Sequence, residues 1–396
     1  MALVVRLGQA LHRFGAPADR VEATMERLSR RLGLQGNFFA VPTSIHAAFG
    51  PPGAQTTFLV RLPPTGATDL GRLAAVDALV VALARGHLDA PAAEARLAAI
   101  VDAPPRHSRP RLLAAHALVS GATAAVLEGS SADVALAGLL GLLVGAAGLL
   151  GPGRERWAPL YPALAALLAA FVAGLAAAWG APVTPWTVTL AAIIVLMPGL
   201  SLTLAMREVT TGHLNAGAAR LVGVVATFML LGCGIALGDH LAAALPPLAP
   251  PHAGAPLPAL ARPLALAISA LALGALLHAR ARDLPLLVLG SLAAWTGATL
   301  GDALVGPRLA PMLGALALGA AGNAIARALD RPAALVVVPG LMLLVPGALG
   351  VRSLSALLAD DVALGVETAF ATAFVAAALV SGLLFANVLV DPRRDL

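Results

Sequence analysis

A Pro-Gly pair and a group of charged residues stand close together in an otherwise apolar stretch of this chain. The stretch "VLMPGLSLTLAMREVTTGHLNAGAARL" spans residues 195–221. Proline removes a backbone N–H and clashes with the preceding turn, and glycine tolerates the bent backbone, so Pro198-Gly199 predicts a break in a helix. In hydrocarbon, the freed backbone groups need polar partners, and such a break persists where it lines a wet cavity. We therefore expect this break to form a binding site for a small charged molecule that nearby side chains hold or gate.

A second break is expected 148 residues further along the chain. The segment "LVPGALGVRSLSAL" matches "LMPGLSLTLAMREV", and a long apolar stretch follows each of them. Pro339-Gly340 and Pro346-Gly347 together form the counterpart of the first Pro-Gly pair. Paired interruptions at corresponding positions of two halves are a pointer to the substrate site of a transporter. The alternative interpretation is that these residues only kink packed helices, in which proline and glycine are common.

The residues predicted to bind the substrate are those of the breaks and the polar side chains near them: Pro198, Gly199, Ser201, Thr203, Arg207, Arg220, Asn323, Pro346, Gly347 and Glu367. Arg220 and Glu367 follow their respective prolines by 22 and 21 residues. A charge about two turns inside an apolar stretch is costly and usually faces a cavity or a partner. We expect Arg220 to bind a carboxylate and Glu367 an ammonium group; the alternative is two structural charges at opposite membrane surfaces.

Several of these residues also have a structural interpretation. Arg207 is explained equally well by a long side chain that reaches the membrane surface, and Asn323 by a hydrogen bond between helices. Proton coupling needs a group that changes charge during the transport cycle. The candidates for that role are Glu367, Asp302 and His213.

Composition indicates the setting of these residues. The 396-residue chain is 59% hydrophobic and 12% charged, with a mean hydropathy of +0.86, whereas about a quarter of a soluble domain is charged. All the basic residues are arginine, which excludes a P-loop or Schiff-base lysine. The single Cys233 permits neither an internal disulfide nor a cysteine-rich metal site. We expect a polytopic membrane protein that is not an enzyme, with no cofactor, no metal and no nucleic-acid partner.

Residues 1–110 differ from the rest because no run there reaches the roughly 20 apolar residues that cross a bilayer. Residues 17–34 predict an amphipathic helix. The segments "NFFAVPTSIHAAFG" and "TTFLVRL" have the composition of strands, and helices are expected at 69–86 and 91–101. This region predicts a small soluble α/β domain on the cytoplasmic side.

Ten apolar stretches follow, five in a half at 111–240 and five in a half at 262–396, separated by a Pro-rich linker at 241–261. Twelve arginines fall in the connections that would be cytoplasmic, and three, Arg262, Arg308 and Arg352, in those outside. This asymmetry predicts that both termini are cytoplasmic. An odd number of spans in each half inverts the second half relative to the first. The fold predicted is therefore ten transmembrane helices in two inverted five-helix repeats, preceded by the α/β domain. The stretches are expected at 111–128, 132–150, 157–179, 186–206, 213–238, 262–279, 284–301, 308–328, 332–351 and 362–390.

Three segments carry a resemblance to a known family: "FGAPADRVEATMERLSRRLGL…FFAVPTSIHAAFG", "MPGLSLTLAMREVTTGHLNAGAARL" and "VPGLMLLVPGALGVRSLSALL". Together with the order of domain and spans, they resemble the bacterial threonine/serine exporter family in its fused two-half form. The resemblance implies proton-coupled export of threonine and serine across the bacterial inner membrane, by alternating access around a site at the midplane. Two-subunit relatives resemble exporters of succinate-type acids, so export of small carboxylates is the first alternative. A membrane sensor or scaffold with a cytoplasmic partner-binding domain is the second. The oligomeric state is left open, a homo-oligomer included.

Overall fold

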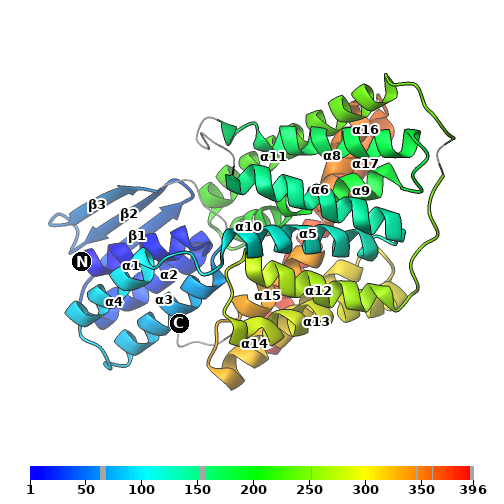
Figure 1. Cartoon of the computed structure of the whole chain (residues 1–396). Helices are drawn as coiled ribbons and strands as arrows, with labels where there is room; N and C mark the ends of the chain where they lie inside the picture. The colour runs from blue at the N-terminus through cyan, green and yellow to red at the C-terminus, as the bar shows by residue number, and fades with distance from the viewer. Residues whose placement is uncertain (63–67, 151–156, 251, 345–346, 359, 393–396) are drawn as a thin grey trace.

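The computed structural model describes residues 1–392 except 63–67, 151–156, 251, 345–346 and 359. The chain forms an N-terminal part that contains a β-sheet and a larger part that is helical throughout (Figure 1).

The N-terminal part packs helices against one face of a three-stranded antiparallel sheet of order β1-β2-β3. Its amphipathic helix α2 turns the apolar stripe Val21, Met25 and Leu28 inward, where all three side chains are buried. Alternate residues of β2 face the same core, because successive side chains of a strand point to opposite faces. The elements are α1 (Ala2–Arg13), α2 (Ala18–Arg31), β1 (Gly36–Val41), β2 (Ser44–Phe49), β3 (Thr56–Arg61), α3 (Leu70–Ala84) and α4 (Ala90–Asp102).

Among the described residues of the helical part, seven helices are long and apolar enough to cross a membrane, or eight if one sharply bent pair forms a single span. The chain is therefore a polytopic helical membrane protein. The elements of the first half are α5 (Arg109–Val126), α6 (Ser131–Leu150), α8 (Tyr161–Ala178), α9 (Pro185–Ala192), η1 (Ile194–Leu196), α10 (Gly199–Thr210) and α11 (Leu214–Ala243). Those of the second half are α12 (Ala261–Leu276), η2 (Ala281–Asp283), α13 (Leu284–Val305), α14 (Ala310–Leu329), α15 (Ala334–Leu344), α16 (Gly347–Leu358) and α17 (Val362–Leu389).

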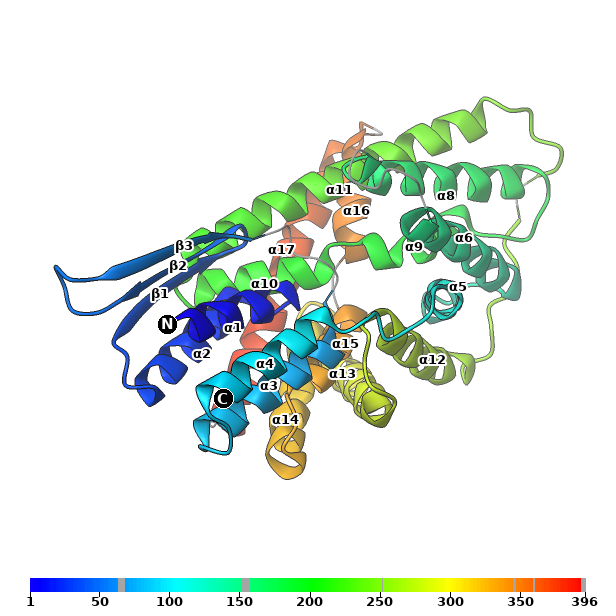
Figure 2. The ribbon, with the colours of Figure 1, turned by 60° about the vertical axis from the view of Figure 1, so that its left-hand side comes forward.

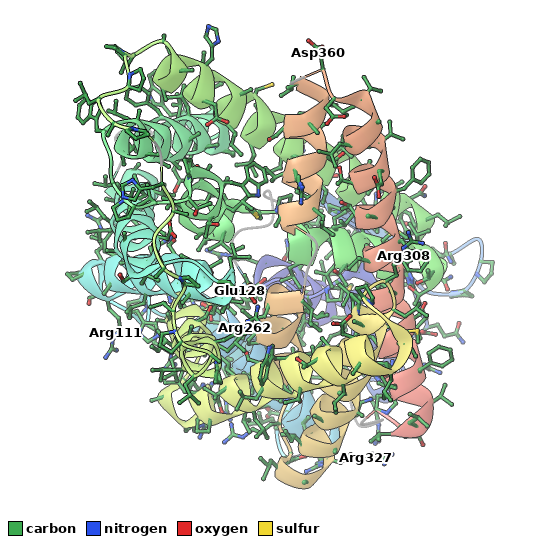
Figure 3. The ribbon with its side chains drawn as sticks, turned by 90° about the vertical axis from the view of Figure 1, so that its right-hand side faces the viewer. Arg111, Glu128, Arg262, Arg308, Arg327 and Asp360 are labelled. Atoms are coloured by element: carbon green, nitrogen blue, oxygen red, sulfur yellow. The ribbon has the colours of Figure 1, made fainter. Side chains whose placement is uncertain are left out.

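Two of the ten predicted spans, α5 and α12, do not meet the criteria of length and apolarity for a membrane span. The apolar helix α12 has only 16 residues, and Arg109 and Arg111 lie in the first turn of α5. These two helices pack against each other. An ion pair of 2.5 Å between Arg262 and Glu128 also ties the first turn of α12 to the end of α5 (Figure 3). The two helices thus form one packed pair.

The last two helices of each half have similar lengths and start at the same spacing. Helices α10 and α16 each contain 12 residues, and α11 and α17 begin 148 residues apart, as α10 and α16 do. Helix α16 packs on α11 of the first half, and α10 packs on α17 of the second. Each half therefore inserts one short helix against the other half.

The N-terminal part lies against one end of the helical part. Helices α1 and α2 lie beside α10, and β1 runs beside the start of α11 (Figure 2). The N-terminal part also contacts the second half, because the Leu70 N–H at the start of α3 donates to the Leu277 carbonyl just after α12 (2.9 Å). The N-terminal part therefore touches both halves of the helical part.

Candidate functional site

The first helix break separates α9 from α10. Helix α9 ends at Ala192, one 3-10 turn follows, and Met197 has an extended backbone before Pro198 begins α10. Since proline lacks an N–H and fits the first turn of a helix, the chain resumes its helix here in a new direction. The two helices are bent by 52°. One carbonyl next to the break, that of Ala192, accepts a hydrogen bond from Ser120 Oγ of α5 (3.4 Å).

The segment predicted to contain the second break comprises α15 and α16, which together count as one candidate span, Ala334–Leu358, rather than as a sharply bent pair. Pro339 lies inside α15, and Gly340 packs closely against Leu318 of α14. Helix α15 ends at Leu344 and α16 starts at Gly347. Pro346, one of the predicted binding residues, lies outside the described residues.

The first break lies in contact with the start of α16. A Cβ added at Gly347 would lie 3.1 Å from Met197 Cβ and 3.3 Å from its sulfur. Beside this contact is a cavity of about 40 Å³, which we call the break cavity. It has room for a few water molecules, since one needs roughly 10–15 Å³, but not for an amino acid. Its walls include Met197, Gly199 and Leu200 of the first break, Met342 and Leu343 of α15, Gly347 of α16, Thr123 of α5 and Ser269 of α12.

Two hydroxyl groups are part of the wall of the break cavity. Thr123 Oγ1 donates to the Val119 carbonyl of its own helix (2.8 Å). Ser269 Oγ is buried and has no hydrogen-bond partner among the described residues. A buried hydroxyl normally has a partner, so an orphan of this kind in a cavity wall indicates a place for a polar ligand or water. No charged side chain is among the described residues of this wall.

The other polar residues predicted near the first break contribute less to the cavity. Thr203 is buried and donates through Oγ1 to the Gly199 carbonyl of its own helix (3.3 Å). Ser201 is half-buried. Neither Ser201 nor Thr203 is among the described wall residues of the break cavity. Gly199, at the start of the same helix, is part of that wall.

The charged residues predicted after the first break form a network with the N-terminal part, and Glu208 is its centre. The Glu208 side chain is 0% exposed, and that of Arg220 is 13% exposed. Arg220 donates to both carboxylate oxygens of Glu208, through Nε (2.9 Å) and Nη2 (2.8 Å). The Ala18 N–H, in the first turn of α2, donates to the same carboxylate (3.1 Å). A bidentate pair at a helix N-terminus combines two favourable electrostatic contacts.

Two further ion pairs join the same surfaces. Arg207 contacts Asp19 of α2 (2.7 Å), and His213 Nε2 lies 3.2 Å from a Glu22 carboxylate oxygen. Glu22 also accepts the Ala40 N–H of β1 (2.7 Å). Arg207, His213 and Arg220 thus engage carboxylates that hold α10 and α11 to the N-terminal part, and we call these contacts the latch.

A buried histidine lies next to the latch. His12 of α1 is buried, and its Nε2 has no hydrogen-bond partner among the described residues. Burial lowers the pKa of His12 from 6.5 to about 4, helped by the positive charge of Arg220 and opposed by Glu208. At neutral pH, His12 is therefore uncharged and acts as part of the core.

The remaining predicted residues lie elsewhere. Glu367 and Asp302 are exposed on α17 and α13. Asn323 Nδ2 donates to Asn387 Oδ1 (2.9 Å) and to the Val390 carbonyl (2.8 Å), a contact between the ends of α14 and α17.

Arg220 pairs with Glu208, and no ion pair joins it to Glu367 among the described residues. By the 148-residue offset, the counterpart of Arg220 is Thr368, which is buried. Since one residue turns a helix by about 100°, Glu367 faces a different direction.

Four residues of these sites were not predicted from the sequence. Asp19 and Glu22 lie in the N-terminal part, far along the chain from their partners Arg207 and His213, so the sequence does not reveal these contacts. Thr123 and Ser269 stand alone in apolar helices. The sequence gives one indication that the Thr123 and Ser269 hydroxyls could lie close together. They are carried by α5 and α12, which are the first helices of the two halves.

Comparison with known proteins adds the following. Two models of the threonine/serine exporter family match the chain: ThrE over residues 2–242 and ThrE_2, "Threonine/Serine exporter, ThrE", over residues 263–389. The boundary between the two matches falls in the Pro-rich connection before α12.

Curated relatives are more distant. Pheromone-regulated membrane protein 10 of Candida albicans is 24% identical over 88% of this chain and 33% of its own length. An uncharacterized protein of Schizosaccharomyces pombe is 24% identical over 60% of this chain and 32% of its own. The chain thus spans about a third of the length of these relatives. No solved structure matches it.

Proposed function

Because the chain belongs to the threonine/serine exporter family, we propose that it is a secondary exporter of small polar amino acids such as threonine and serine. The substrate binds where the first break meets α15 and α16, and transport proceeds by alternating access around that point. The observation that carries this proposal is the break cavity, in which Met197 and Gly347 of opposite halves touch beside the unpartnered hydroxyl of Ser269.

The character of the cavity wall favours a zwitterion over a dicarboxylate. A dianion such as succinate needs compensating positive charge when it leaves water. The wall residues that the structure describes are apolar or hydroxyl-bearing, and Arg220 is already neutralised by Glu208. A zwitterion carries no net charge, and hydroxyls and free backbone groups at the breaks suit its carboxylate, ammonium and side-chain hydroxyl.

The two halves are inverted repeats in this proposal, and the packing of their last helices supports it. A Cβ added at Gly217 would meet Val209 Cγ2, and one added at Gly365 would meet Leu357 Cγ. Gly365 lies 148 positions after Gly217, and Leu357 lies 148 positions after Val209. Helix α10 therefore packs on α11 as α16 packs on α17. In transporters with inverted repeats, one unit rocks against the other around a site at their interface.

The break cavity must enlarge to admit an amino acid, so the conformation described here is closed around the site. Opening toward the N-terminal part requires movement of α10 or α11, which the latch holds. We therefore assign the latch the role of a gate on this side. Opening on this side therefore requires the Glu208 carboxylate to separate from Arg220 or from the Ala18 N–H.

Of the residues predicted to couple transport to protons, Glu367 and Asp302 are exposed on α17 and α13 and lie outside the latch. His213 remains a candidate because it faces Glu22 within the same network. The N-terminal part is placed on the cytoplasmic side, which follows from the distribution of arginines along the chain.

The experiment that tests the function is counterflow in proteoliposomes that contain the purified full-length chain. Vesicles loaded with unlabelled L-threonine should accumulate labelled L-threonine and L-serine, while succinate should not exchange. Exchange of succinate instead of threonine would assign the chain to carboxylate export. If neither solute exchanged, the proposal of an exporter would fail in favour of a sensor or scaffold.

A further inference from the structure

A second, larger cavity lies outside the membrane helices, between the N-terminal part and the loop after α12. Its volume is about 730 Å³, within the range of roughly 300–1,000 Å³ that is usual for small-molecule sites. Its walls come from α1, α3, α4 and His278 of the loop. We call it the junction cavity. Neither the break cavity nor the latch shares a wall residue with it.

The charges of the junction cavity define the ligand that it fits. Arg6 pairs with Glu94 (2.6 Å), and Arg72 lies 3.6 Å from Asp69, so these four charges compensate one another. The two remaining charged residues of the wall are Arg13, at the end of α1, and Asp102, at the end of α4.

Neither Arg13 nor Asp102 has an ion-pair or side-chain hydrogen-bond partner among the described residues. One positive and one negative group without partners in the same cavity match a molecule that carries one charge of each sign. Gln9 of α1 adds a neutral hydrogen-bonding group to the same wall.

The loop at the edge of this cavity shows two further features of a ligand site. His278 Nδ1 is buried without a hydrogen-bond partner among the described residues. The His278 backbone is in the left-handed region, with a φ of 51°, which non-glycine residues adopt at an energetic cost and which is often retained at functional positions.

The position of His278 links the cavity to the membrane helices. It follows α12 directly, and Ser269 lies nine residues earlier, about 14 Å along a helix. The His278 ring also stacks on His107, at a centroid distance of 5.7 Å and an angle of 11°. Because His107 precedes α5, the stacked pair joins the two helices that carry Thr123 and Ser269 into the break cavity.

We infer that the junction cavity is a binding site for a zwitterionic amino acid, with the carboxylate on Arg13 and the ammonium on Asp102, and that α12 transmits its occupancy to the transport site. The site is distinct from the proposed transport site, and it senses the solute on the side of the N-terminal part.

Thiol labelling of the full-length chain tests the binding. In a Cys233→Ser background, Ala98→Cys places a thiol in the cavity wall, and Ala99→Cys places one on the exposed surface of the same helix as a control. L-Threonine should slow maleimide labelling at position 98 but not at 99, while succinate and a diamine should protect neither. Equal labelling at 98 with and without L-threonine would overturn the site.

Two variants test the assigned contacts. Arg13→Gln and Asp102→Asn should each raise the half-protecting concentration of L-threonine by about tenfold or more, the usual effect of losing a hydrogen bond to a charged group. Arg31→Gln removes the same charge outside the cavity and should leave protection unchanged. Full protection in both cavity variants would refute the charge assignment.

Two outcomes separate this inference from the proposed function. Protection at position 98 should persist in Gly347→Leu, which fills the break cavity; loss of protection there would mean that the junction cavity is not a separate site. Counterflow by the parent chain should rise more steeply than hyperbolically with L-threonine, and Arg13→Gln should make it hyperbolic. A hyperbolic parent curve would overturn the transmission through α12.

Discussion

Removal of the Glu208 carboxylate tests the latch. Glu208 is fully buried and holds Arg220 by two charge-assisted hydrogen bonds of 2.8 and 2.9 Å, while the Ala18 N–H donates to the same carboxylate. In Glu208→Ala, the guanidinium of Arg220 stays largely buried without its counter-charge, and the Ala18 N–H loses its acceptor. Breaking a buried pair from one side costs about 3–5 kcal/mol. We expect a loss of this size in the stability of the docked arrangement.

A double-mutant cycle measures the latch most cleanly. Glu208→Ala, Arg220→Ala and the double variant are compared by thermal unfolding in detergent and by protease sensitivity of the N-terminal part. Each single change should destabilise strongly, and the double variant should lose much less than the sum of the two. The exposed pair Arg30 and Glu26, at 3.7 Å, is the matched control and should show little coupling. Additive losses at Glu208 and Arg220 would refute the reasoning.

Four other changes give further tests. Gly347→Leu should abolish L-threonine counterflow at normal expression, because the new side chain enters the break cavity. The control Gly223→Leu, on the open surface of α11, should remain active. Normal counterflow by Gly347→Leu would contradict the site. Ser269→Val should weaken L-threonine transport. Its thermal stability should be equal to or higher than that of the parent, because the change removes a buried hydroxyl without a hydrogen-bond partner among the described residues. Lower stability with normal transport would contradict a role of Ser269 in binding the substrate. Glu208→Gln should increase the protease sensitivity of the N-terminal part, because a neutral amide no longer forms a charge pair with Arg220, and unchanged sensitivity would contradict this role of Glu208. Folding lowers the pKa of His12 from 6.5 to about 4, so between these pH values the unfolded chain binds more protons than the folded chain. The contribution of neutral His12 to the free energy of unfolding should therefore be complete above pH 6.5 and fall by up to about 3 kcal/mol toward pH 4. The same fall in His12→Leu would contradict this.

The first break could be predicted from the sequence because its cause is local. Proline at position 198 lacks the N–H that a continuous helix needs, and its ring restricts the preceding residue, so the interruption follows from the residue type alone. The same reasoning predicts a break at the counterpart pairs Pro339-Gly340 and Pro346-Gly347, but Pro339 lies inside α15 and Gly340 packs against Leu318. A proline in a helix thus does not by itself produce a sharp bend.

The partners of the charged residues could not be predicted, because they depend on contacts between distant parts of the chain. Arg207 meets Asp19 across 188 positions, and Glu208 accepts a backbone N–H from across 190. The sequence therefore predicted a charged substrate for Arg220 where the structure places a carboxylate of the chain itself. Ser269 was missed for a related reason: a serine in an apolar helix usually bonds its own backbone, and only the packing around α12 leaves it without a partner.

The spans α5 and α12 also show the limit of sequence patterns. Their apolar stretches predict two membrane crossings, but α12 has only 16 residues and α5 begins with Arg109 and Arg111. Both helices still expose leucines, among them Leu118 of α5 and Leu264 of α12. An apolar stretch therefore does not fix the length of the helix that forms from it.

The most direct test of the central claim is an electron cryo-microscopy structure of the full-length chain in lipid nanodiscs with saturating L-threonine. The account predicts density for one amino acid between Met197 and Gly347, within hydrogen-bond distance of Ser269 Oγ, with the two breaks further apart than in the closed conformation. Side chains packed solidly between the breaks, with L-threonine bound at another place among the membrane helices, would contradict it.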